Sequence, residues 1–245
     1  MYELLYEYAI RAGAEMSVCA YTRVDAESGK VLCREMTQFG NLVIDMKENR
    51  DKLAIINTSL WNKLLRRDIA LKHIRFEHAP RVAEDMMFLL SIYPQVKRIA
   101  FCGETLYCYY VRSGSAMSHV DEEEAEHLRS SMVRTRDHVR EYGKDWDNVI
   151  NLFSFIHFGI AFVLKSSGAK GKSLTAMERE IKQWMNREFT GWNRNPYLRC
   201  RHVLGGHAYL LKPMLVLWMY RLRLFPIFLR MYVWVTERWK FDIKW

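Results

Sequence analysis

Segments with helical and strand-like patterns alternate along the first 118 residues, and this alternation constrains the fold more than any other feature. Residues 2–12 place Leu5 and Tyr8 on one helical face and stop at Gly13, which suits a helix C-cap. The pattern predicts helices over 2–12, 59–67 and 83–93, and strands over 16–21, 31–33, 98–102 and 106–111. We therefore expect an α/β fold.

The character of the sequence changes after Asp121, where three glutamates open a long helix and favour its N-terminal dipole. Helices are predicted over 121–142, 147–165 and 173–187, with a loop at 166–172. We therefore expect two regions: an α/β domain at 1–120 and a mainly α-helical region at 121–245.

The C-terminal tail, 207–245, mixes large apolar and aromatic residues with arginine. Arg221, Arg223 and Arg230 interrupt the apolar run before the roughly 18 uncharged residues of a membrane span accumulate. Aromatic residues interleaved with arginines are typical of a helix in the headgroup layer of a membrane. The same pattern also fits a pair of core helices packed on the α/β part, and both interpretations stay open.

The charge balance favours anionic partners. The chain of 245 residues has 37 basic and 28 acidic residues, a formal charge of +9. No phosphate-binding GxxxxGK[ST] or dinucleotide-binding GxGxxG motif occurs, and no basic element matches a known nucleic-acid module. We therefore expect no nucleic-acid partner.

The cysteines indicate free thiols. There are five, an odd number, and none form a CxxC pair. We expect mostly buried, reduced thiols and a cytoplasmic protein, with attachment to the inner face of the cell membrane as the variant that the tail suggests.

Three segments occur in a fixed order. They are Ser-Leu-Trp-Asn-Lys-Leu-Leu-Arg-Arg at 59–67, Arg-Val-Ala-Glu-Asp-Met-Met-Phe at 81–88, and Leu-Tyr-Cys-Tyr-Tyr-Val-Arg-Ser-Gly-Ser-Ala-Met-Ser at 106–118. Together they resemble the second half of the catalytic domain of family-2 glycosyltransferases. The resemblance implies a partial GT-A-like sheet. It also implies inverting transfer of a sugar from a nucleotide-sugar to a glycan, polymer or lipid-linked acceptor in bacterial cell-surface polysaccharide synthesis.

The resemblance gives Glu84 and Asp85 catalytic roles. Asp85 would take the proton from the acceptor hydroxyl as general base, and Glu84 would orient the acceptor. A second carboxylate beside the base raises its pKa through like-charge repulsion. Apart from the resemblance, the pair also fits an ordinary helix N-terminus, where acidic residues are common.

The segment after the aromatic strand resembles the part of the family that clasps the leaving diphosphate. Arg112, Ser115 and Ser118 are the matching positions, since guanidinium and hydroxyl groups stabilise a developing phosphate charge. His119 would complete a metal site, as a histidine does in some relatives. An arginine before a polar turn and a surface histidine are the structural alternatives.

Trp61 and Lys63 match a W-x-K element of the family, in which the lysine faces a donor phosphate or an acidic acceptor. The alternative is an amphipathic helix with Trp61 and Leu64 inward and the basic residues in solvent. The tyrosines at 107, 109 and 110 suit either stacking on a sugar or base, or core packing.

Complete members of the family begin with a nucleotide-binding half and an Asp-x-Asp motif that holds Mg²⁺ or Mn²⁺ on the donor. Residues 1–120 match only the part of the family's domain that lies after this motif, so we expect this chain by itself to bind nucleotide-sugar weakly. Two other functions stay open: a non-catalytic remnant that binds an acceptor glycan or a partner, and a basic membrane-surface adaptor whose tail is the working part.

Overall fold

A computed structural model describes residues 1–73, 80, 82–112, 122–166 and 174–239. The chain divides into two compact units, Met1–Trp146 and Asp147–Trp245. The first unit extends past the predicted boundary at 120 because it includes helix α4 (Glu122–Arg140), which packs on α3 (Glu84–Ile92). Over the described residues, every helix is too short or too polar to cross a membrane.

The first unit is built on a five-stranded mixed sheet, so the α/β class is confirmed for this part of the chain. Its strands are β1 (Met16–Asp25), β2 (Val31–Glu35), β3 (Val43–Asp45), β4 (Lys63–Leu65) and β5 (Arg98–Val111). The order is β2-β1-β5-β3, and β4 also pairs with β1. Strands β1 and β5 run parallel, whereas the other pairs are antiparallel.

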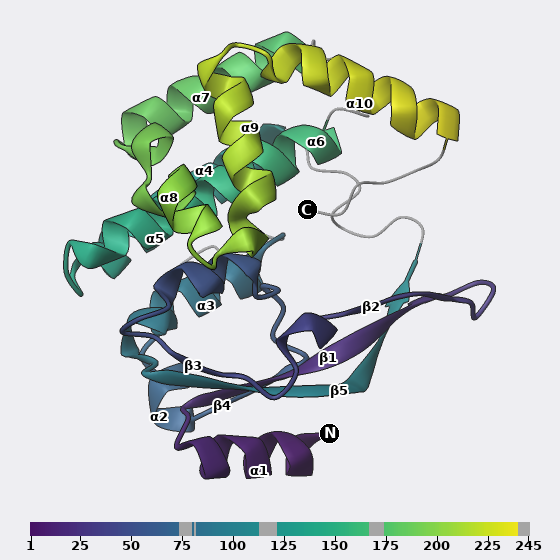
Figure 1. The fold of residues 1–245 in the computed structure, drawn as a ribbon, viewed down its shortest axis with the longest axis vertical. Helices are drawn as coiled ribbons and strands as arrows, with labels where there is room; N and C mark the ends of the chain where they lie inside the picture. Colours follow the sequence, from purple (N-terminus) through teal and green to yellow (C-terminus); the bar gives the residue numbers. More distant parts are fainter. Residues whose placement is uncertain (74–79, 81, 113–121, 167–173, 240–245) are drawn as a thin grey trace. The chain divides into compact units, whose positions relative to one another are not determined.

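Helices cover the sheet on both sides (Figure 1). Helix α1 (Tyr2–Ala12) buries Leu5 against Cys19 of β1 and Cys102 of β5, which stand opposite each other in the parallel register. Helix α3 lies on the other side of the sheet and buries most of its side chains. The predicted C-cap is confirmed, because Gly13 has φ 56° and donates to carbonyls of the last turn.

The predicted helix over 59–67 is wrong. Residues 61–62 form a turn, β4 follows at Lys63–Leu65, and the short helix α2 begins only at Arg67 (Arg67–Ala70). β4 pairs antiparallel with β1, with Leu65 opposite Met16. This pairing gives the backbone N–H and C=O groups of β4 hydrogen-bond partners on another strand, so they need no helix to satisfy them. The two predicted strands over 98–102 and 106–111 are one strand, β5, whose register against β1 shifts between them.

Over its described residues the second unit consists of helices joined by turns, without a strand, so it is mainly helical, as the sequence predicts for this region. Apart from short 3-10 turns, its helices are α5 (Asp145–Ser154, beginning in the first unit), a π-helical segment (Phe155–Phe162), α6 (Val163–Ser166), α7 (Leu174–Glu188), α8 (Cys200–Leu204), α9 (Leu211–Arg221) and α10 (Phe225–Trp239). Helix α10 packs on α7 and α9 (Figure 1). The Tyr220 hydroxyl donates to the Gly159 carbonyl at 2.6 Å, which joins α9 to the π-helical segment.

All five cysteines are free thiols. Cys19 and Cys102 are buried, Cys33 is half-buried, and Cys108 and Cys200 are exposed. The expectation that most of the thiols are buried is therefore wrong, because Cys108 and Cys200 stand on outward-facing positions.

Candidate functional site

The acidic pair stands at the first turn of α3, where the helix dipole favours negative charge. Ala83, the residue before it, has φ 61°, a left-handed conformation that an alanine adopts only when the surroundings hold it there. Glu84 is exposed and Asp85 is half-buried. The backbone turn at Ala83 therefore sets where the two carboxylates project.

Asp85 is tied to the loop that precedes β4. One of its carboxylate oxygens, Oδ2, accepts a hydrogen bond from the backbone N–H of Leu60 at 3.0 Å. This loop is itself anchored on β1: Asn62 donates to the Cys19 carbonyl at 2.7 Å, and the Cys19 N–H donates back to the Asn62 carbonyl at 3.0 Å. The sheet thus positions the loop, and the loop positions Asp85.

Lys63 organises the same loop from inside. Its Nζ lies within hydrogen-bond distance of four oxygens: the Asn57 carbonyl at 2.8 Å, Asn57 Oδ1 at 2.8 Å, the Ser59 carbonyl at 2.6 Å and Asn62 Oδ1 at 2.9 Å. Lys63 is only 7% exposed. Its ammonium group therefore works as an internal cation for loop 57–63, and its side chain is turned away from solvent.

Burial lowers the pKa of Lys63 to about 7, while the charges of Asp85 and, to a smaller extent, Cys19 raise it. The hydrogen bonds act in the same direction as Asp85, since a neutral amine donates only two protons and four oxygens face this one. Deprotonation would leave buried oxygens without donors. The loop oxygens therefore partly offset the cost of burying the ammonium form, and burial remains the larger effect.

Trp61 forms the aromatic part of the site. Its ring stacks on Tyr107 of β5 at 4.4 Å between centroids and on Tyr109 at 5.3 Å, and meets Tyr21 of β1 edge-on at 4.7 Å. Trp61 and Tyr107 are half-buried, and Tyr109 is exposed. Loop and sheet together give a partly open aromatic surface of the kind on which a sugar ring packs.

The structure brings together three of the predicted site residues: Trp61 and Lys63 on the loop, and Asp85 bonded to it. Glu84 shares the helix start with Asp85. Arg112 is exposed just after β5, and in the described part of the chain it makes no ion pair with this cluster. The predicted residues Ser115, Ser118 and His119 lie outside the described residues.

The sequence assigned no role to the residues that hold Lys63. Asn57 supplies two acceptors and Ser59 one, while Asn62 contacts both the ammonium and β1. The amide beside the lysine in Trp-Asn-Lys was a usable signal, because a buried lysine needs oxygen partners. Asn57 carries no such signal, since only the folded loop brings it to Nζ.

The predicted metal stays a prediction, since His119 lies outside the described residues. The second unit places two further imidazoles together: His202 and His207 stack at 3.8 Å between ring centroids, and His207 Nδ1 lies 2.7 Å from the Tyr209 hydroxyl. Within the second unit this pair supplies two ligands, whereas a protein zinc site takes at least three. This pair therefore carries no assignment.

Searches for relatives do not identify the chain: no protein-family model and no curated protein matches it.

Proposed function

We propose that the first unit is the acceptor-side part of a GT-A-like glycosyltransferase, acting in synthesis of a cell-surface polysaccharide. The observation that carries the proposal is the hydrogen bond from Leu60 to Asp85, which sets a half-buried carboxylate beside the Trp61 loop. A carboxylate next to an aromatic surface is what an enzyme needs to bind a sugar hydroxyl and remove its proton.

Asp85 acts as the general base. Its Oδ2 is occupied by the Leu60 N–H, and we assign Oδ1 to the acceptor hydroxyl. As the hydroxyl oxygen forms a bond to the anomeric carbon of the donor, its proton passes to Asp85. The bond from that carbon to the diphosphate oxygen breaks, and the nucleoside diphosphate leaves with the electron pair. Glu84, exposed beside the base, orients the acceptor.

The remaining roles follow from the resemblance and belong to the same proposal. Arg112, Ser115 and Ser118 stabilise the leaving diphosphate; His119 would be one ligand of a Mg²⁺ or Mn²⁺ ion, which would supply further charge neutralisation there. The donor is a nucleotide-sugar, and the acceptor is a glycan, a polymer or a lipid-linked sugar. Lys63 is a loop-positioning residue here, because its ammonium is occupied by protein oxygens.

The test replaces the gene in its own cell with Asp85→Asn and measures sugar transfer from labelled nucleotide-sugars in cell extracts. Loss of a general base lowers the rate by about 100-fold or more. The asparagine oxygen can still accept from Leu60, so the free energy of unfolding should change by about 1 kcal/mol or less. The matched control is Glu3→Gln, an exposed carboxylate in the first turn of α1.

Two outcomes would overturn the proposal. If Asp85→Asn transfers sugar as fast as the Glu3→Gln control, Asp85 is not the base. If extracts lacking the gene transfer every donor sugar normally, yet the purified chain binds glycans and loses that binding in Trp61→Ala, the unit is a non-catalytic acceptor binder.

A further inference from the structure

An apolar face that the second unit leaves in solvent runs along its last two helices. Leu211, Leu215 and Trp218 of α9 are exposed at helical spacing, followed by Leu222 at the C-cap, and on α10 Ile227, Met231 and Trp234 are exposed in the same way. The opposite faces of both helices are buried, through residues such as Leu217 and Leu229. Each helix therefore has one apolar face in the core and another in water, which marks an interaction site.

The charge around this apolar face is of one sign. Between His207 and Val235 the sequence has no acidic residue, but it has Lys212 and three arginines, Arg221, Arg223 and Arg230. All four are exposed. Tryptophans at the edge of a headgroup layer and arginines facing it are the composition of helices that bind anionic bilayers.

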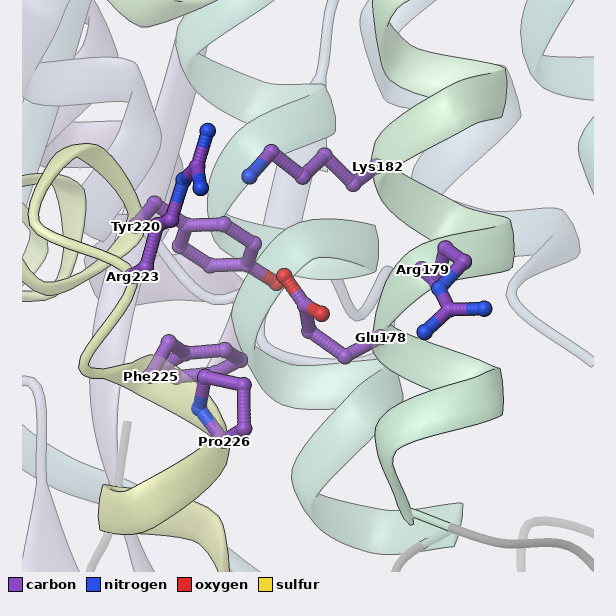
Figure 2. Close-up of a pocket in the computed structure, with 7 residues that line it drawn as sticks. All are labelled: Glu178, Arg179, Lys182, Tyr220, Arg223, Phe225 and Pro226. Atoms are coloured by element: carbon purple, nitrogen blue, oxygen red, sulfur yellow. The ribbon is translucent and has the colours of Figure 1, made fainter.

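A pocket of about 340 Å³ opens where α9 turns into α10 (Figure 2). Three cations line it: Arg179 and Lys182 from α7 and Arg223 from the turn. Figure 2 shows the charged ends of Lys182 and Arg223 on the same side of the pocket.

One carboxylate also lines the pocket. Glu178 lies beside the Tyr220 hydroxyl (Figure 2), and burial raises its pKa, with Lys182 and Arg179 opposing that shift. Burial and the Glu178 charge raise the pKa of Tyr220 in turn. Among the residues that line the pocket there are three cations and one acid, so its lining is net positive and favours an anion.

Arg223 connects the pocket with the apolar face. It has φ 60°, a left-handed conformation that is costly for a residue with a side chain. Its neighbours Leu222 and Leu224 are 60% and 45% exposed. The turn thus presents a cation to the pocket between two apolar side chains directed at solvent.

We propose that the α9–α10 face docks on an anionic phospholipid bilayer and that the pocket takes the phosphate of one lipid headgroup. Leu222, Leu224 and Ile227 enter the acyl boundary, while Arg223 and Lys182 hold the phosphate. This surface is independent of the function proposed for the first unit.

The experiment is vesicle flotation of the full chain with phosphatidylcholine vesicles, with and without phosphatidylglycerol. We expect flotation only with the anionic lipid. Ile227→Asn should weaken it about tenfold through lost apolar burial, and Arg223→Gly about fivefold through one lost charge. Glycine suits the left-handed backbone at 223, so this variant removes the cation without strain.

Matched controls come from the first unit. Ile10→Asn changes an isoleucine that is 63% exposed, compared with 64% for Ile227, and Arg11→Gln removes an exposed charge from α1. Both should float as the wild type does. Melting temperatures of all the variants establish that each is folded.

Three results would overturn the proposal. The first is equal flotation with and without phosphatidylglycerol. The second is an Ile227→Asn variant that changes a dimer to a monomer in solution while vesicle binding is absent throughout, which makes the face a contact between two copies. The third is protection of Arg223 by inorganic phosphate from an arginine-modifying reagent while no vesicle binding is seen. That result makes the pocket a site for a free anion.

Discussion

Lys63 in the first unit and Lys182 in the second show two opposite uses of a partly or fully buried cation. Lys63 has four protein oxygens within 2.9 Å and almost no exposure. Lys182 is half-buried, lies 6.0 Å from the Tyr220 ring centroid and lines an open pocket with Arg179 and Arg223. The first cation is satisfied by its own chain, whereas the second is left for a ligand.

This difference separates structure from binding. A buried charge without partners is strongly unfavourable, so a fold keeps one only where oxygens of the chain surround it, as around Lys63. A cluster of like charges beside an open pocket costs less because water solvates it, and a bound anion relieves the repulsion. Deleting each cation should therefore affect different properties of the protein.

The largest effect on stability is expected for Lys63→Met. It removes the donor of four buried or half-buried oxygens and should lower the free energy of unfolding by about 3 kcal/mol. Lys182→Met should change it by about 0.5 kcal/mol or less, since Lys182 is half-buried beside an open pocket, 6.0 Å from the Tyr220 ring centroid, and solvent screens its attraction to Glu178. Urea denaturation followed by circular dichroism measures both.

Lys47→Met supplies the baseline, because Lys47 is an exposed lysine of the first unit. The comparison breaks if Lys63→Met and Lys47→Met unfold at the same urea concentration, since loop 57–63 would then not depend on the ammonium group.

The next effect is a pH dependence from Lys63. Its folded pKa, about 7, lies below its ordinary value of 10.5, so between these limits the folded state binds fewer protons than the unfolded state. The contribution of Lys63 to the free energy of unfolding therefore rises with pH from 7 towards 10.5, by at most about 1.4 kcal/mol per pH unit. It is constant below pH 7.

Urea denaturation at several pH values between 6 and 9 measures this slope, and Lys63→Met should remove it. A wild type whose slope above pH 7 equals that of Lys63→Met would show that Lys63 keeps its proton in this range. The hydrogen bonds to the loop would then outweigh the cost of burying the charge.

The loop that carries Lys63 also shows where prediction from sequence stopped. The start of α3 at Glu84 and the alternation of helix and strand were predictable, because acidic first turns and apolar runs are local signals. The pattern of Trp61 and Leu64 fits a helix as well as a strand edge. Only pairing of β4 with β1 and burial of Lys63, both long-range, decide between them.

In the second unit, the sequence left two interpretations of the tail open, membrane docking and core packing. In the structure α9 and α10 each bury one apolar face within the second unit, against elements that include α7 and the π-helical segment, and each has a second apolar face in solvent. The pocket was not predictable. It depends on α7 and the α9–α10 turn meeting around Tyr220, which no spacing in the sequence encodes.

A smaller effect is expected at Ala83, the left-handed residue before the acidic pair. Ala83→Gly removes a backbone cost of about 1–2 kcal/mol, and the greater freedom of glycine in the unfolded chain offsets about half of it. We expect the free energy of unfolding to rise by about 0.5–1 kcal/mol. A fall would mean that the Ala83 side chain contributes packing that exceeds the strain.

The smallest effect on stability is expected for Arg223→Gly in the second unit. Arg223 has φ 60°, so glycine relieves the cost of a left-handed backbone there as it does at Ala83. The variant also loses the contacts that the arginine stem makes at the pocket. The net change in the free energy of unfolding should therefore be within about 0.5 kcal/mol. This variant sharpens the comparison with Lys63, because its fold should be intact while its vesicle binding is weakened. A loss of stability as large as that of Lys63→Met would instead make Arg223 a structural cation of the α9–α10 turn, and the contrast between the two units would disappear.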